Sequence, residues 1–496
     1  MEHQHSRITA PDSSHSLPIH ADSAPQERAA TASATVAPSA DVSTVAASTR
    51  RARSALFINR NFINRNFAVL WAGQALSTLG DTVFSTTLVV WIAAQLARNQ
   101  PWAPLAVSGV VLAAAIPALV IGAVAGVFVD RMEKRRLMLA MDSMRALIVG
   151  ALILVTGAIP LSLAPSGRLP LSWILGAIYA VVFLVNVADQ FFSSALLVFI
   201  SDLVPEEEQA KAMGLRQAAV SFASIVGPAL AAPLFIAFGA QWALLIDALS
   251  FVVSFMTIAA VRPPRAATHI VSAERANFAR EWREGLRFFV HNRVLMTLLG
   301  AMSVAVTGAI ALETLNVFFT TDTLHAPISL YGFLGAAFGI GAIAGATLAG
   351  LFAERVGVGR TFWLCLLLAG VVVVVLSRVA TFGLALPLFA LIGLLITGVN
   401  VAVGPLLLRA TPRELLGRVN SVIGPAMSAS ILIGTALAGY LDGEVLRGLR
   451  VAIGGTTFGP VDTIYAGAGV LFIASALVAR VGLRPVDKRL RKRPFE

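Results

Sequence analysis

The stretch Gly126-Val-Phe-Val-Asp-Arg-Met-Glu-Lys-Arg-Arg-Leu137 decides the fold, because it places a charged turn between two long apolar runs. The runs, about 105–129 and 137–160, are each long enough to cross a bilayer. Four cations and two acids fall within seven residues of this turn. The sequence therefore predicts two membrane helices joined by a short polar turn. Any cytoplasmic turn of a membrane protein is enriched in arginine, so the turn alone does not identify a family.

The composition of the whole chain is that of an integral membrane protein. Of 496 residues, 57% are hydrophobic and 13% are charged, and the mean hydropathy is +0.79. Soluble domains carry about 25% charged residues. The net charge of +11 does not indicate nucleic-acid binding, because the cations recur at the ends of apolar runs. We expect lipid around the chain and no nucleic-acid partner.

Apolar runs of membrane-spanning length follow one another through the chain. Twelve are predicted, at about 67–96, 104–129, 136–159, 172–201, 208–236, 241–261, 294–321, 329–353, 361–379, 383–408, 417–441 and 461–483. Lipid offers no hydrogen-bond partner to the backbone, so these runs are expected to be helices, and barrel strands would be shorter and alternating. The predicted fold is all-α and integral to the membrane, with 12 transmembrane helices in two six-helix halves.

The polar segments between these runs give the predicted domain organisation. Residues 1–65, rich in Ala, Ser, Thr and Pro, are expected to form a disordered basic cytoplasmic tail. The two halves span 66–262 and 294–484, and a second basic tail covers 485–496. The central cytoplasmic loop, 263–293, has apolar residues at helical spacing within 278–290, which predicts an amphipathic helix on the membrane surface.

Cations gather on one side of the predicted membrane domain. That side carries the lead-in to the first helix, the charged turn, the central loop and the C-terminal tail. The opposite side has only scattered cations, such as Arg98 and Arg447. The positive-inside rule then predicts a multi-pass protein of the inner (plasma) membrane with both termini in the cytoplasm.

Two motifs of the first half recur in the second. The turn motif G-x-x-x-[DE]-R, first seen at 126–131, returns at 350–355, each time after the second helix of its half. The segment 224–232 of the fifth helix is matched by 431–439. Parallel repeats are typical of transporters whose site lies between the halves near the membrane midplane. The candidate conformational-switch residues are Gly126, Asp130, Arg131, Arg135, Arg136, Glu354 and Arg355.

The pattern G-x-x-x-D-R-x-x-[KR]-R-R resembles the signature loop between helices two and three of the major facilitator superfamily, and the resemblance covers about 66–484. Within that superfamily the chain is most similar to the branch containing macrolide efflux proteins and the enterobactin exporter. The segments that carry this likeness are Asn66–Gln74, Ser77–Asp81, Asp202–Glu206, Gly227–Pro228, Asp247–Phe251 and Gly417–Val419. Glu133 stands where many members have glycine, a departure that concerns the local geometry of the loop.

The resemblance implies secondary active efflux of a drug-like or siderophore-like molecule by alternating access, driven by protons, in a monomer. It also implies that the first and fourth helix of each half line a central cavity. A polar stripe occurs on each of these four helices. The candidate cavity residues are Gln74, Ser77, Ser85, Asn186, Gln190, Ser193, Asn316, Thr320 and Asn400.

Ionisable side chains inside membrane helices need a specific reason, because each costs about 2.5–3.5 kcal/mol on insertion scales. Asp81, Glu313 and Asp189 are the proton-coupling candidates, since a carboxylate there can take a proton from one side and release it to the other. The alternative is that these acids bond to neighbouring helices and only fix their packing.

Three other charged residues are expected to be structural. Asp142 and Arg145, three residues apart, are placed near the cytoplasmic end of the third helix, where they can pair. Asp247 is placed close to the outer surface.

Two other functions remain open. An uptake carrier for a small nutrient or ion uses the same fold, although the four cavity helices have no mid-span Arg or Lys to hold an anion. A non-transporting receptor would leave the polar stripes unexplained. An enzyme is not expected and no cofactor or metal is predicted, because no phosphate loop, nucleophile motif or metal-ligand spacing occurs. Cys365, the single cysteine, excludes an intrachain disulfide.

Overall fold

The computed structural model describes residues 63–98, 100–122, 125, 128–129, 132–155, 170–261, 287, 289–411, 416–449, 451–453 and 456–483. Residues 1–62 of the predicted N-terminal tail and all of the predicted C-terminal tail lie outside these residues, as does almost all of the central loop with its predicted amphipathic helix. Gly126, Asp130 and Arg131 of the charged turn also lie outside them.

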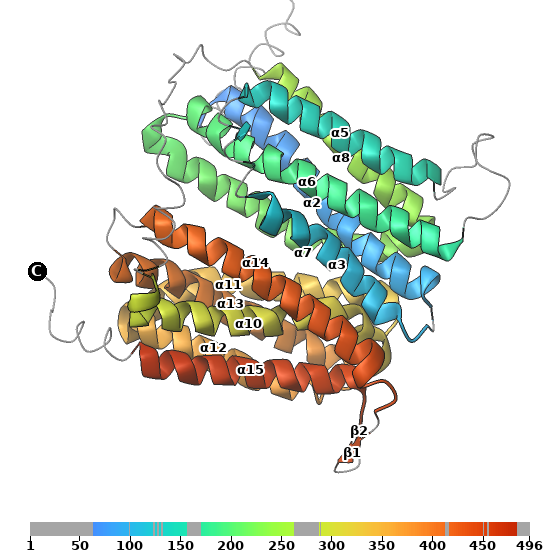
Figure 1. Cartoon of the computed structure of the whole chain (residues 1–496), viewed down its shortest axis with the longest axis vertical. Helices are drawn as coiled ribbons and strands as arrows, with labels where there is room; N and C mark the ends of the chain where they lie inside the picture. Colours follow the sequence, from blue (N-terminus) through green and yellow to red (C-terminus); the bar gives the residue numbers. More distant parts are fainter. Residues whose placement is uncertain are drawn as a thin grey trace, which may run out of the picture. The chain divides into compact units, whose positions relative to one another are not determined.

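Six membrane-spanning helices form the first half of the described chain (Figure 1). They are α2 (Arg65–Trp91), α3 (Ala103–Val120), α5 (Lys134–Val155), α6 (Leu171–Leu203), α7 (Gln209–Phe238) and α8 (Ala240–Ala260). Helix α2 packs against α7 and α8, α5 packs against α6 and α8, and α3 packs against α6.

Six more helices form the second half. They are α10 (Arg293–Phe318), α11 (Tyr331–Val356), α12 (Val358–Leu376), α13 (Phe382–Ala410), α14 (Leu416–Tyr440) and α15 (Pro460–Gly482). Helix α10 packs against α14 and α15, α12 packs against α13 and α15, and α11 packs against α13. This pattern repeats the packing of the first half helix for helix, so the internal repeat of the sequence is also a repeat of the structure.

The predicted fold class is confirmed. All twelve predicted spans are found among the described residues, and each predicted start lies within three residues of the observed helix start. Apolar length fixes these helices, because each must satisfy its own backbone hydrogen bonds inside lipid.

Several short elements were not predicted. Three π-helical turns extend α2, α10 and α14, namely η1 (Ile92–Leu96), η3 (Phe319–Thr323) and η6 (Leu441–Val445). Single 3-10 turns, η2 (Glu206–Glu208) and η4 (Ile328–Leu330), precede α7 and α11. An antiparallel hairpin, β1 (Val451–Ile453) with β2 (Thr456–Phe458), lies in the connection expected to be a loop.

One asparagine fixes the beginning of each half. Asn64 Oδ1 accepts a hydrogen bond from Phe67 N at 2.7 Å and so caps α2, while Asn64 Nδ2 donates to Leu203 O at the end of α6 (2.9 Å). Asn292 caps α10 in the same way, and its Nδ2 donates to Ala410 O at the end of α13 (2.9 Å). In both halves a helix cap therefore ties the first helix to the end of the fourth.

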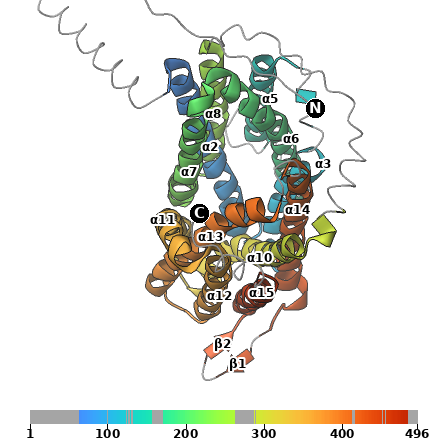
Figure 2. The same ribbon diagram turned by 90° about the vertical axis from the view of Figure 1, so that its left-hand side faces the viewer.

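The halves meet along two helix pairs, α7 with α11 and α3 with α14, seen from two directions in Figures 1 and 2. We call the end of the membrane domain where α2 begins and α15 finishes the near end, and the opposite end the far end. A Cβ added to Gly332 of α11 would collide with Pro228 O of α7, and one added to Gly439 of α14 would collide with Ser108 Oγ of α3. These close crossings lie toward the far end, because α11 and α3 begin there and α14 finishes there.

Candidate functional site

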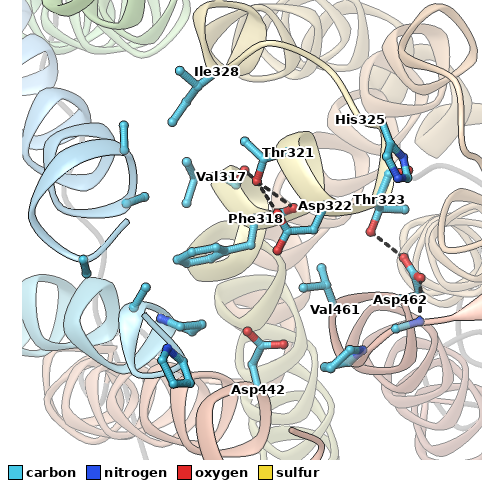
Figure 3. A pocket seen from close by; sticks show the side chains of 18 of the residues that line it. Val317, Phe318, Thr321, Asp322, Thr323, His325, Ile328, Asp442, Val461 and Asp462 are labelled. Carbon is cyan, nitrogen blue, oxygen red and sulfur yellow. Dashed lines mark hydrogen bonds between the residues drawn. The ribbon is translucent and has the colours of Figure 1, made fainter. Parts of the chain in front are cut away.

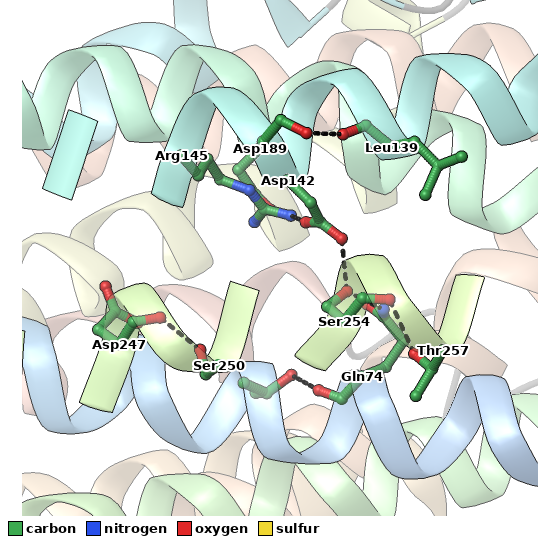
Figure 4. A network of polar contacts seen from close by, with 11 residues as sticks. Gln74, Leu139, Asp142, Arg145, Asp189, Asp247, Ser250, Ser254 and Thr257 are labelled. Atoms are coloured by element: carbon green, nitrogen blue, oxygen red, sulfur yellow. Dashed lines mark hydrogen bonds and ion pairs between the residues drawn. The ribbon is translucent and has the colours of Figure 1, made fainter. Parts of the chain in front are cut away.

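A buried polar network crosses the first half between α2, α5 and α8 (Figure 4). Gln74 Nε2 on α2 donates to Ser254 Oγ on α8 at 2.8 Å, and Ser254 Oγ donates to Asp142 Oδ2 on α5 at 2.6 Å. Arg145 Nη2, one turn further along α5, donates to Asp142 Oδ1 at 2.5 Å. Gln74, a predicted cavity residue, is thus a member of a structural network.

Arg145 is the centre of this network. Its side chain is 3% exposed, and its guanidinium lies over the rings of Phe192 and Phe251, 4.3 and 4.6 Å from their centroids. Arg145 Nη1 reaches Asp189 Oδ1 on α6 at 3.3 Å. Two carboxylates and two aromatic faces together stabilise this cation inside the helix packing.

The structure corrects the predicted place of Asp142 and Arg145. They occupy the ninth and twelfth positions of the 22-residue α5, so they lie at mid-helix and not near its cytoplasmic end. At 1.5 Å per residue, Arg145 is about 16 Å from the beginning of α5. Arg145 is stable at this depth because it pairs with Asp142 on its own helix, as predicted, and has further partners on α6 and α8. The sequence alone does not show the contacts with α6 and α8.

Asp189 joins the network to the polar stripe of α6. Its side chain is 44% exposed, whereas the side chain of Asp142 is fully buried. Arg145 therefore holds one carboxylate inside the helix packing and a second at the exposed edge of that packing. Although α6 has no mid-span cation of its own, α5 supplies one to it.

Asp81 belongs to the same group of charges. It is half-buried at position 17 of the 27-residue α2, and its electrostatic neighbours are Arg145, Asp189 and Asp142. The structure thus brings two of the three predicted coupling acids together around one arginine.

The third coupling candidate lies in the other half. Glu313 is exposed, although it is at position 21 of the 26-residue α10 and the next residue, Thr314, is buried. Tyr331, at the beginning of α11, is its electrostatic neighbour and packs beside Val90 and Phe235 of the first half. Glu313 therefore lies near the boundary between the halves.

The other predicted cavity residues have varied environments. Four of them hydrogen-bond within their own helices: Ser85 to Thr82 O, Asn186 to Val182 O, Ser193 to Gln190 O and Thr320 to Asn316 O. Ser77 is buried, Gln190 is half-buried, and Ser85 and Asn400 are exposed. Within the described residues, the side-chain oxygen of Asn316 is buried without a hydrogen-bond donor.

Asp247 is misplaced in the prediction. It lies at position eight of the 21-residue α8, where it is 0% exposed, rather than close to the outer surface. It faces α2, because a Cβ added to Gly80 would lie 3.1 Å from Asp247 Oδ1. The close approach of α2 and α8 at this glycine excludes water from the carboxylate, and a glycine in a membrane helix gives no such signal by itself.

A cavity of about 1350 Å³ lies at the far end and is lined by both halves (Figure 3). The first half contributes η1, the beginning of α3 and the end of α7, and the second contributes η3, the residues just after α12, η6 and the beginning of α15. Its ionisable lining residues are Asp322, Asp442, Asp462, His325, Arg98, Arg378 and Arg447. Asp462 accepts hydrogen bonds from Thr323 Oγ1 (2.6 Å) and Gly459 N (3.0 Å), which joins η3 to α15. Polar residues in predicted loops gave no sign that they converge here.

The described part of the predicted switch loop has local partners. Arg135 donates to Ile258 O (3.2 Å) and Ala259 O (2.6 Å), so it closes the carboxyl end of α8. Arg136 forms an ion pair with Glu133 at 2.6 Å on the surface. Glu133, the residue that departs from the family pattern, therefore has a partner. Glu354 and Arg355 of the second half are exposed at the end of α11.

Among the described residues, no group of three or more His, Cys, Asp or Glu side chains is arranged to hold a metal ion. Cys365 is buried and free.

Comparison with known proteins identifies the family. The sequence is 26% identical over 385 residues to macrolide efflux protein A of Streptococcus pyogenes, covering 75% of this chain and 88% of that protein. It is 23% identical to YkuC, an uncharacterized MFS-type transporter of Bacillus subtilis, over 84% of this chain and 91% of that one. The fold is similar to the crystal structure of the nucleoside transporter NupG, with a TM-score of 0.63 and 11% identity over 85% of this chain and 100% of NupG. The profile of the Major Facilitator Superfamily matches residues 70–323 and 306–496, and the chain is thus a multi-pass membrane transporter that belongs to this superfamily.

Proposed function

We propose that this transporter exports an amphipathic, drug-like or siderophore-like molecule by alternating access, and that protons entering the cell drive the export. The observation that carries the proposal is the exposure of two acids deep inside membrane helices, Asp189 on α6 and Glu313 on α10. Carboxylates at such positions are costly and mark ion or proton pathways. The similarity to macrolide efflux protein A supports an organic substrate.

The contacts between the halves support loading from the cytoplasm. The close crossings at Gly332 and Gly439 hold the halves together toward the far end. If the near end faces the cytoplasm, as the positive-inside rule predicts, this conformation receives substrate from inside the cell. The far-end cavity then serves as the exit, and its mixture of acids and arginines favours weak binding and release.

Inverted membrane vesicles test this function. A respiratory substrate acidifies their interior, and macrolides and siderophores are then offered from outside. We expect at least one compound to accumulate inside, and a protonophore to abolish the accumulation. Accumulation in right-side-out vesicles instead would establish an uptake carrier. Accumulation that requires ATP and is not abolished by a protonophore would refute proton coupling.

Glu313→Gln tests coupling separately from binding. The glutamine amide keeps the shape of the side chain, but it neither takes up nor releases a proton near neutral pH. We expect the variant to bind substrate and to catalyse counterflow exchange, which needs no net proton movement, while uphill transport is lost. Glu444→Gln in η6 is the matched control, because Glu444 is exposed and does not line the far-end cavity. Full uphill transport by the Glu313 variant would make that acid a packing residue.

A further inference from the structure

Asp247 on α8 is a buried acid without a visible partner. Its residue exposure is 0%, and within the described residues neither carboxylate oxygen has a hydrogen-bond donor. Ser250, one turn away, donates to the backbone oxygen of Asp247 (2.8 Å) and not to its carboxylate. A buried ionised carboxylate with no donor and no counter-ion is strongly unfavourable.

The surrounding charges do not supply a counter-ion. Asp81 on α2 and Arg145 on α5 are the electrostatic neighbours of Asp247. Arg145 already binds Asp142 and, on α6, Asp189. Four carboxylates thus surround one arginine, and Arg145 is the only mid-span cation of the first half among the described residues.

Asp142 shows what an ionised acid looks like in the same setting. It is as fully buried as Asp247, but it accepts hydrogen bonds from Arg145 at 2.5 Å and from Ser254 at 2.6 Å. The two acids therefore share full burial and differ in their partners. The charge of Asp142 is paired with an arginine, whereas Asp247 has no such partner and must be neutralised in another way.

We propose that Asp247 holds a proton in this conformation and that Asp247 and Asp81 together form a proton-binding site between α8 and α2. This site deepens the proposed function and rests on it for its role in coupling. The proton moves between a carboxyl oxygen of Asp247, the carboxylate of Asp81 and water, and no other bond changes. A cationic substrate near Asp81 favours two ionised carboxylates, so its binding expels the proton, and the cation and the proton exclude each other.

Infrared spectroscopy of the full chain in lipid vesicles tests the site without requiring transport. We expect wild type at neutral pH to show the carbonyl band of a protonated carboxylic acid, shifted by exchange into D₂O. Asp247→Asn removes this band component, and Asp247→Glu moves it without removing it, which covers the case that the asparagine variant fails to fold. Glu444→Gln, at an exposed acid outside this network, is the control and retains the band. A spectrum unchanged by both Asp247 substitutions would overturn the proposal.

Proton release then connects the site with export. The probe is tetraphenylphosphonium, a lipophilic cation, added to the protein in weakly buffered solution with a pH indicator dye. We expect wild type to release protons on binding it and Asp247→Asn to lose this release. An infrared band at Asp247 in wild type that binds the probe without releasing protons would support the site and refute its coupling to the export of cations. Undiminished release by Asp247→Asn, together with proton-driven export, would support the export and refute the site.

Discussion

Arg145 separates two kinds of carboxylate in the first half, and the difference has a measurable consequence. Asp142 is buried and 2.5 Å from the guanidinium, whereas Asp189 is 44% exposed and 3.3 Å away. Asp142→Ala leaves a buried cation with one weaker partner, so we expect a loss of about 3–5 kcal/mol in the free energy of unfolding. Asp189→Ala, with its partly solvated carboxylate, should cost clearly less. Thermal unfolding in detergent compares the two, and equal losses would contradict this assignment.

The asparagines that cap the first helix of each half give a second testable prediction. Asn64 and Asn292 each cap the first helix of a half and donate to the end of the fourth helix. Replacing either with alanine should reduce the free energy of unfolding by about 1 kcal/mol for the cap, with a further loss for the inter-helix bond. Because the two sites lie in different halves, the double variant should show the sum of the single losses. A loss much larger than the sum would mean that the two capping sites are energetically coupled.

The crossing of α7 and α11 is a contact between helices that can also be tested. Gly332→Ala forces a methyl group against Pro228 O, so it should disfavour this conformation by about 1–3 kcal/mol. Gly335→Ala is the control, because its Cβ would lie an ordinary 3.5 Å from Pro228 Cβ. Spin-label distances between the far ends of α7 and α11 should lengthen in the first variant only. Unchanged distances in Gly332→Ala would show that the crossing adapts without opening.

For the whole molecule, sequence length and hydropathy were sufficient to predict twelve helices in two halves, because lipid allows few alternatives. The site was predicted less completely. The stripes on single helices led to Asp81, Asp189 and Glu313 as candidates, which remain predictions. They did not show that Arg145 reaches Asp189 from α5 or that Gly80 covers Asp247. Those contacts join residues far apart in the chain, and helical periodicity within one segment contains no information about them.

Orientation is the remaining prediction for the whole molecule. In a Cys365→Ser background, Thr456→Cys in β2 should react with a membrane-impermeant thiol reagent added to intact cells, because the positive-inside rule places the hairpin outside. A cysteine at Arg287, in the predicted cytoplasmic loop, should react only after the cells are lysed. The reverse labelling pattern would mean that the protein has the opposite orientation in the membrane. The assignments of entrance and exit would then be exchanged.

The three π-helical turns have a consequence for the comparison of relatives. In η3, Leu324 N bonds to Phe319 O five residues earlier, so the helix accommodates one residue more than an α-helical turn would. One residue corresponds to a rotation of about 100° around the helix axis. The stripe through Glu313 and Thr320 would continue to Leu324, which is buried and does not line the far-end cavity, whereas the three residues Thr321–Thr323 before it do. An alignment with a relative that lacks this turn therefore needs a one-residue gap within 319–323, and without it every cavity residue beyond that point would be matched to the wrong neighbour.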